Sequence, residues 1–188
     1  MYQCNQCGWL RLKDLWIHFS GRVYRAINPR WSYEPTSGAG AALFGGRFNP
    51  PGTPALYTSL RFETAWLEAQ QGFPLKSQPL TICTYQVDIE NILDLTDPTT
   101  CGRLSISQDD LACAWRSLHD DRLPVPTWEL ARLCNANRTR GIIAPSFAVG
   151  AGPQDRNLIL WQWSDSRPSQ VVVIDDEGRL PRNPDSWH

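Results

Sequence analysis

Residues 45–68 carry the side chains best suited to chemistry: Arg47 after two glycines, Tyr57 at the end of a short apolar run, and the carboxylates of Glu63 and Glu68. Paired glycines let the chain turn sharply and let a ligand approach the main chain. A guanidinium at this turn suits a phosphate or carboxylate, because its planar fork donates two parallel hydrogen bonds. The same residues are typical of a solvated loop, so an anion site and an ordinary turn stay alternatives on local chemistry alone.

The two glutamates stand on a predicted helix that begins near Ser59 or Leu60, directly after a brief strand over residues 55–58. Successive helical residues are about 100° apart, so two positions separated by five residues differ by about 140° after a full turn. Glu63 and Glu68 therefore point to different sides of the helix. Only one of them can face a given pocket.

A second arginine, Arg25, lies on a predicted first strand over residues 22–26, where polar and apolar side chains alternate. The period of a strand places Arg25 on the same face as Val23. A half-buried arginine needs an anion, and a bound ligand could supply it. The following residues 28–54 form an unusually long predicted loop, and loops of this length usually bind or cover something.

Short strands and few helices are predicted for the rest of the chain. Predicted strands cover residues 80–87, 92–95, 141–144, 157–161 and 171–175, and predicted helices cover 107–117 and 128–135. Ser107 and Thr127 suit the N-cap positions of these helices, because a hydroxyl there accepts a hydrogen bond from an unpaired backbone N–H. Strands and helices do not alternate strictly, which indicates an α+β domain. We place this domain at residues 21–178, after an N-terminal arm (1–20) and before a polar tail (179–188).

The N-terminal arm holds apolar residues at helical spacing, which predict a short amphipathic helix: Leu12, Leu15, Trp16 and Phe19. Cys4 and Cys7 form one C-x-x-C pair, which is half of a zinc site, and His18 is the nearest further ligand. No second pair follows, so a site completed by a partner and an incidental pair stay alternatives. We expect the activity itself to need no metal.

The bulk composition excludes several classes of protein. A chain of 188 residues with 41% apolar side chains is long enough for one domain with a core. Its formal net charge of −1 gives no field that would draw it to nucleic acid or an anionic membrane. No stretch has the length of a membrane span or the layout of a signal peptide, so we expect a cytoplasmic protein.

The basic residues and the isolated cysteines add two further expectations. Lys13 and Lys76 are the only lysines among 18 basic residues, which leaves sixteen arginines. This excess fits recognition of phosphates or carboxylates, and a nucleotide bias of the genome would produce it equally well. Four isolated cysteines are expected to be reduced thiols: Cys83, Cys101, Cys113 and Cys134.

Several of these segments together resemble the RES domain, a family named for its arginine, glutamate and serine. The resemblance rests on residues 45–59, the Glu-Thr-Ala and Leu-Glu pieces over 63–68, the Ala-Pro-Ser of 144–146, and residues 157–161. It covers residues 22–175 and is most specific in the first segment. It implies a fold similar to ADP-ribosyltransferase toxins: a single α+β domain with a mixed, mostly antiparallel sheet flanked by helices.

The resemblance also implies an activity. Many members of the family are toxins of bacterial toxin–antitoxin pairs, inhibit growth, and have an Xre-like helix-turn-helix antitoxin as partner. Their substrate is NAD⁺, which they cleave at the nicotinamide ribose by hydrolysis or phosphorolysis, or use for ADP-ribosyl transfer to a protein. A non-catalytic NAD-binding or immunity-type module is the alternative from another class. Direct binding to nucleic acid or a membrane is not expected, and a homo-oligomer stays an alternative to a monomer.

Carried onto this sequence, the family pattern assigns Arg25 and Arg47 as NAD-binding arginines and Tyr57 as the pocket tyrosine. It assigns Glu68 as the catalytic glutamate, because Glu68 rather than Glu63 follows Tyr57 at the family's spacing. Breaking the nicotinamide–ribose bond builds positive charge on the sugar, and a fixed carboxylate stabilises that charge. In the same scheme, Tyr57 stacks on the nicotinamide ring.

The family's serine falls on Ser146, which follows a proline and precedes a glycine-rich turn. Its expected role is to hold the ribose or a phosphate, since a hydroxyl both donates and accepts hydrogen bonds. Ser146 is therefore counted with Glu68 and Arg47 among the expected catalytic residues. No G-x-G-x-x-G motif occurs, so the arginines would have to bind the pyrophosphate without a Rossmann fingerprint.

Overall fold

The computed structural model describes residues 12–71 and 78–187, and Cys4 and Cys7 lie outside these ranges. Six strands occur in the described residues: β1 (Ile17–Ile27), β2 (Leu56–Ser59), β3 (Thr81–Asp94), β4 (Gly141–Pro145), β5 (Arg156–Leu160) and β6 (Ser169–Val173). The α-helices found there are α1 (Ala39–Phe44), α2 (Phe62–Gln70), α3 (Pro98–Leu104), α4 (Gln108–Ala112), α5 (Trp115–Asp120) and α6 (Pro126–Ala136). Three short 3₁₀ segments complete this part of the chain: η1 (Leu12–Leu15), η2 (Pro29–Trp31) and η3 (Pro184–Trp187).

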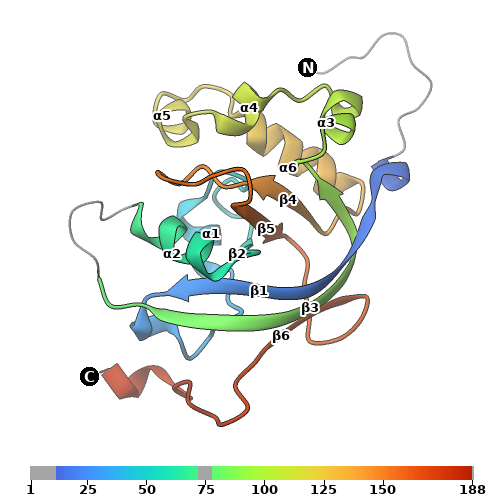
Figure 1. Ribbon diagram of the computed structural model, residues 1–188. Coiled ribbons are helices and arrows are strands. Elements are labelled where there is room, and N and C mark those ends of the chain that lie inside the picture. Colours follow the sequence, from blue (N-terminus) through green and yellow to red (C-terminus); the bar gives the residue numbers. More distant parts are fainter. Residues whose placement is uncertain (1–11, 72–77, 188) are drawn as a thin grey trace.

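The strand pairings close on themselves. The order is β1-β2-β5-β4-β3-β6, and β3 also pairs with β1, so five strands form a ring to which β6 is added. The β3–β4 pair is parallel, whereas the other pairs are antiparallel. In Figure 1, β1 and β3 curve along one side of the molecule, α3 to α6 cover the opposite side, and α1 and α2 lie beside β2. The predicted α+β domain with a mixed, mostly antiparallel sheet is confirmed.

Gly141 stands where the ring closes, because it pairs with Ile92 of β3 and with Leu160 of β5. A Cβ atom at this position would approach the backbone oxygen of Ile159 to 2.4 Å. Any other residue would push the two strands apart, so glycine is required by close approach rather than by its dihedral freedom.

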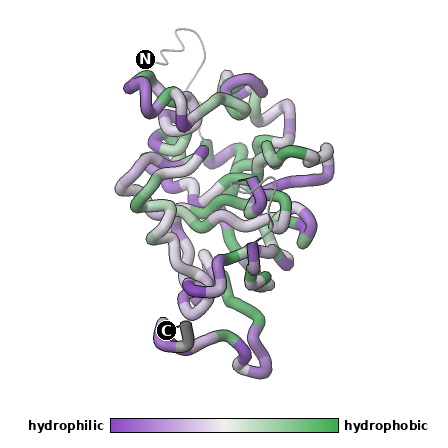
Figure 2. The backbone as a smooth tube through the Cα atoms, turned by 90° about the vertical axis from the view of Figure 1, so that its left-hand side faces the viewer, coloured by the Kyte–Doolittle hydropathy of each residue, from purple (hydrophilic) through white to green (hydrophobic). Residues whose placement is uncertain are grey.

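The apolar core has two parts, one on each side of β4 and β5. Ile142 and Ile159 pack with the helices, while Ile143, Leu158 and Leu160 face the long strands β1 and β3. Both faces of β4 and β5 are thus buried, which explains why their sequences are continuously apolar. Figure 2 shows the hydrophobic stretches gathered in the middle of the molecule.

The strands predicted over residues 80–87 and 92–95 are one strand, β3. Asn91 has a left-handed φ of 62° within it, and β3 contains one more residue than β1 between the partners Ile89 and Ile92. This is a β-bulge, which bends a strand without ending it. An asparagine tolerates the left-handed conformation better than most residues, so the chain bends at Asn91 and the strand continues.

The amphipathic helix predicted in the arm is largely wrong. The described residues form only the 3₁₀ segment η1 before β1 begins at Ile17, and Phe19 lies in β1, where it packs against the core around β3. Ten of the eleven residues of β1 pair with residues of β3. Tertiary pairing therefore outweighs the local helical spacing.

The helical predictions need four corrections. The supposed loop over 28–54 contains η2 and α1, and the helix predicted over 107–117 is two helices, α4 and α5. Ser107 does cap α4, with a reciprocal bond to Asp110. Helix α3 was not predicted, although Asp97 caps it and Pro98 occupies its first turn. Helix α6 begins at Pro126, so its N-cap is Val125 rather than Thr127.

Within the described ranges, every helix falls short of the length and apolarity that crossing a membrane requires. Of the four isolated cysteines, Cys83, Cys101 and Cys134 are buried and Cys113 is partly exposed, all as free thiols.

Candidate functional site

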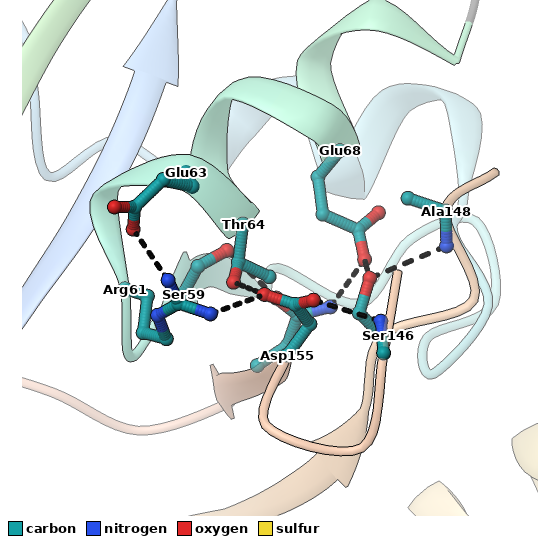
Figure 3. A network of polar contacts seen from close by, with 10 residues as sticks. Ser59, Arg61, Glu63, Thr64, Glu68, Ser146, Ala148 and Asp155 are labelled. Carbon is teal, nitrogen blue, oxygen red and sulfur yellow. Dashed lines mark hydrogen bonds and ion pairs between the residues drawn. The ribbon is translucent and has the colours of Figure 1, made fainter. Parts of the chain in front are cut away.

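Glu68 lies on the inward face of α2 and its carboxylate is fixed by hydrogen bonds. Its Oε1 accepts from the Ser146 hydroxyl at 2.6 Å and from the Asn157 side-chain amide at 2.5 Å. Gln71 also donates to its Oε2. Glu63 points elsewhere, is exposed, and pairs with Arg61 at 3.3 Å. Figure 3 shows the two glutamates on different sides of α2, as the helical spacing predicts.

The partners of Glu68 come from the ends of β4 and β5, which pair with each other. Ser146 follows β4, and its backbone N–H donates to the Asp155 carbonyl at 2.7 Å. Asn157 pairs with Ala144 on β4 and with Ser59 on β2. The Ser59 hydroxyl donates to Asn157 Oδ1 at 2.7 Å, which turns the amide nitrogen toward Glu68. Sheet pairing thus aims two donors at one carboxylate.

Asp155 joins the turn between β4 and β5 to helix α2. Its carboxylate accepts from the Thr64 hydroxyl at 2.5 Å and from the Gly152 N–H at 2.8 Å, and Arg61 lies 3.4 Å away. These hydrogen bonds, first that of Thr64, lower the pKa of Asp155 below its ordinary value. Thr64 and Glu68 are four residues apart and so share one face of α2. This contact, drawn in Figure 3, fixes the face that carries Glu68.

Arg47 faces the same region from the loop before β2. Its Nη1 donates to the carbonyls of Leu111 at 3.1 Å and Cys113 at 2.6 Å, and its Cζ lies 4.5 Å from the centre of the Phe147 ring. Removal from water lowers the pKa of the Arg47 guanidinium. Within the described residues, Nη1 donates all the hydrogen bonds of the Arg47 guanidinium, so Nη2 and Nε make none there.

Tyr57 holds the loop that carries Arg47. Its hydroxyl donates to Asn49 Oδ1 at 2.7 Å and accepts from the Phe48 N–H at 2.9 Å. Burial raises the pKa of Tyr57. A Cβ at Gly46 would lie 2.6 Å from this hydroxyl and 2.8 Å from Asn49, so the second glycine admits the tyrosine. At Gly46, the space that the paired glycines were expected to leave for a ligand is filled by Tyr57 and Asn49.

Arg25 lies on the same strand face as the buried Val23, as the alternation of side chains along the strand predicts. Its Nη1 donates to the backbone carbonyls of Pro35 at 3.0 Å and Ser37 at 2.9 Å. These neutral partners stand where an anion was expected. Burial lowers the pKa of Arg25, so its charge is held in a poorly hydrated place.

These side chains meet in one cleft of about 470 Å³, which we call the central cleft. Its wall includes Arg25, Arg47, Tyr57, Glu68 and Asn157. An adjoining inner cavity of about 270 Å³ shares Arg25, Tyr57, Glu68 and Asn157. Two guanidinium groups face one carboxylate among the charged residues that line the central cleft, so it favours an anionic ligand that also presents a group for Glu68.

The structure thus brings together the five residues singled out from the sequence, in two ways. Arg25, Arg47, Tyr57 and Glu68 line the central cleft. Ser146 reaches it through its hydrogen bond to Glu68.

Sequence reasoning missed Asn157, Asp155, Thr64 and Phe147. One weak feature of the sequence could have indicated Asn157 and Asp155: they are polar residues at the start of a strand that is otherwise apolar. Thr64 and Phe147 carried no local signal, because their contacts with Asp155 and Arg47 join segments far apart in the chain. In residues 12–71 and 78–187 no three histidine, cysteine or acidic side chains gather as metal ligands.

A chain of the M. tuberculosis MbcT–MbcA toxin–antitoxin complex superposes with a TM-score of 0.64 at 22% identity, covering 88% of this chain and 87% of that chain. At this identity the likeness establishes a shared fold. No curated protein matches the chain. The family model of the RES domain matches residues 22–183, which is most of the sequence, and the chain therefore belongs to the RES domain family.

Proposed function

We propose that this chain is the toxin of a toxin–antitoxin pair and that it consumes NAD⁺ by cleaving the bond between nicotinamide and ribose. The observation that carries the proposal is the Glu68 carboxylate, fixed by Ser146 and Asn157 at the wall of a cleft that two arginines also line. Membership of the RES family and the shared fold with a chain of a toxin–antitoxin complex support it.

The chemistry needs a rigid negative charge beside the sugar. When the bond between C1′ and the ring nitrogen breaks, nicotinamide leaves with the bonding electrons and becomes neutral, so it needs no proton. The ribose is left with oxocarbenium-like positive charge, which a preorganised carboxylate stabilises more than it stabilises the ground state. We assign this role to Glu68. A nucleophile then bonds to C1′ and completes the reaction, and a water or hydroxyl nucleophile releases its proton to the solvent.

The arginines serve the other half of the substrate. NAD⁺ contains a pyrophosphate with two negative charges, and guanidinium groups bind such oxygens with charge-assisted hydrogen bonds. Arg25 and Arg47 each use Nη1 on backbone carbonyls, so their side chains are already oriented before a ligand arrives. Orientation before binding reduces the entropy lost on binding. The Tyr57 ring, held by its hydroxyl, offers a flat surface for nicotinamide.

Three acceptors are compatible with this site, namely water, inorganic phosphate and a protein side chain. Purified protein is incubated with NAD⁺ in phosphate-free buffer, in phosphate buffer, and with cell-extract proteins, and free nicotinamide is measured by chromatography. We expect nicotinamide in at least one condition, with ADP-ribose, its 1-phosphate or a labelled protein identifying the acceptor. NAD⁺ left intact by folded protein in all three would contradict the proposal. Bound but uncleaved NAD⁺ would indicate the non-catalytic module.

The partner of such a toxin would be an Xre-like helix-turn-helix antitoxin, and both would act in the cytoplasm, where the substrate is found. Co-expression with the product of an adjacent reading frame of this type is expected to restore growth.

A further inference from the structure

A larger cavity of about 510 Å³, which we call the outer cavity, lies beside the central cleft. It is enclosed between the end of β1, the η2 segment and α1, and its wall includes Trp31, Tyr33, Leu43 and Phe44. Trp31 is 53% exposed, Leu43 69% and Phe44 71%, which is unusual for such large apolar side chains in one place. Exposed apolar side chains that gather around a cavity are typical of a binding site.

The outer cavity and the central cleft adjoin each other. Arg25, Gly40 and Phe44 line both of them, so the two spaces share a boundary. Arg25 stands at this junction with its guanidinium oriented by two backbone carbonyls. Gly40 at the same boundary is exposed, and a Cβ there would meet no atom within 4 Å.

The wall of the outer cavity is held in place without a ligand. The Arg25 and Tyr85 side chains both donate to the Pro35 carbonyl, and the Trp163 indole donates to the Thr36 carbonyl at 3.0 Å. These bonds tie the segment after η2 to the sheet. The Trp31 and Tyr33 rings lie 6.4 Å apart at 42°, so their planes are inclined. The Arg30 Cζ lies over the Trp31 ring, 5.6 Å from its centre, so a stacked ligand would use the other face of the indole. A preformed aromatic wall favours a planar ligand, because little ordering is needed on binding.

We infer that the outer cavity binds the adenosine half of NAD⁺, with adenine stacked on the indole of Trp31. The inference rests on the proposed function and adds a second base site to it. If the nicotinamide ribose lies at Glu68 and Arg25 holds the pyrophosphate at the junction, the second nucleoside must extend past Arg25. The outer cavity is the space found there, and its volume falls within the range of about 300–1,000 Å³ typical of small-molecule sites.

The test is a steady-state comparison of three forms of the protein: the parent, Trp31→Ala and Trp66→Ala. Trp66 is the matched control, because it is also a partly exposed tryptophan. It stands two residues before Glu68 on α2 and so points about 200° away from it. For Trp31→Ala we expect the KM for NAD⁺ to rise about tenfold or more, the typical effect of losing one base-stacking contact, with little change in kcat. Trp66→Ala should keep both constants.

A second readout is independent of turnover. Titration of the parent with AMP, which carries the adenosine and one phosphate, should show binding that Trp31→Ala weakens by a similar factor. Nicotinamide mononucleotide, which lacks the adenosine, should bind both forms equally.

The outcomes separate this inference from the proposed function. If the parent releases nicotinamide and Trp31→Ala does so with unchanged KM, the adenosine site is wrong and the proposed activity stands. If the parent binds AMP and Trp31→Ala weakens that binding, but no nicotinamide is released, the nucleotide site stands and the proposed activity is wrong. Equal weakening of AMP and nicotinamide mononucleotide would mean that Trp31 supports the whole cleft, which also overturns the inference.

Discussion

At the scale of single residues, environment rather than residue type distinguishes the functional candidates. Glu63 and Glu68 belong to the same helix, yet only Glu68 accepts hydrogen bonds from Ser146 and Asn157 at the wall of a cleft. The Ser146 hydroxyl, which is expected to hold the substrate, donates to Glu68 and accepts from the Ala148 N–H at 3.2 Å. We therefore regard Ser146 as a positioning residue that aims the carboxylate.

If Ser146 positions Glu68, its removal should lower kcat. Ser146→Ala removes one of the donors that hold Glu68, and a hydrogen bond to a charged group is worth about 1.5–3 kcal/mol. Since part of that energy fixes the carboxylate in the transition state, kcat for NAD⁺ cleavage should fall about tenfold with little change in KM. Ser146→Thr keeps a hydroxyl and should recover most of the rate. A rise in KM alone would instead indicate direct substrate binding by Ser146.

At the scale of elements, the site depends on how α2 is fixed to the turn between β4 and β5. Thr64 and Asp155 make this contact, and both side chains are buried. Because Thr64 lies one turn before Glu68, any movement of this contact moves the candidate catalytic carboxylate.

This contact predicts a pH-dependent stability. The pKa of Asp155 is lowered in the folded protein, first by the Thr64 hydrogen bond, from about 3.9 in an unfolded chain. Its contribution is therefore fully present above about pH 4 and is lost as the pH falls through the folded-state value. Thr64→Val should lower the free energy of unfolding by about 1–3 kcal/mol at pH 7. In urea titrations this difference from the parent should shrink at pH 3, and a difference of equal size at both pH values would contradict the account.

Features that depend on neighbours along the chain could be predicted from the sequence. The divergence of Glu63 and Glu68 follows from helical geometry, and the shared face of Val23 and Arg25 follows from strand alternation. Features that depend on pairing between distant segments were not accessible. Asn157 meets Glu68 only because β5 pairs with β2 and β4, and β3 continues through Asn91 only because β1 lies along it.

At the scale of the whole molecule, the closed ring of strands places the candidate site where several segments meet. Helix α2, the loop before β2 and the turn between β4 and β5 all reach the central cleft, and the segment after β1 forms the outer cavity. The family match and the shared fold support this arrangement of strands and helices. The proposed reaction depends on one carboxylate within it, that of Glu68.

The most direct measurement of the central claim compares Glu68→Gln with Glu63→Gln. Both variants neutralise a carboxylate on α2, but only Glu68 faces the cleft, so the pair isolates the effect of that position. Nicotinamide release from NAD⁺ is followed for each purified variant, after thermal unfolding has shown that both remain folded. Loss of a preorganised charge-stabilising group typically costs about 100-fold or more in rate. We predict such a loss for Glu68→Gln and near-parental release for Glu63→Gln, whereas parental release by Glu68→Gln would contradict the account.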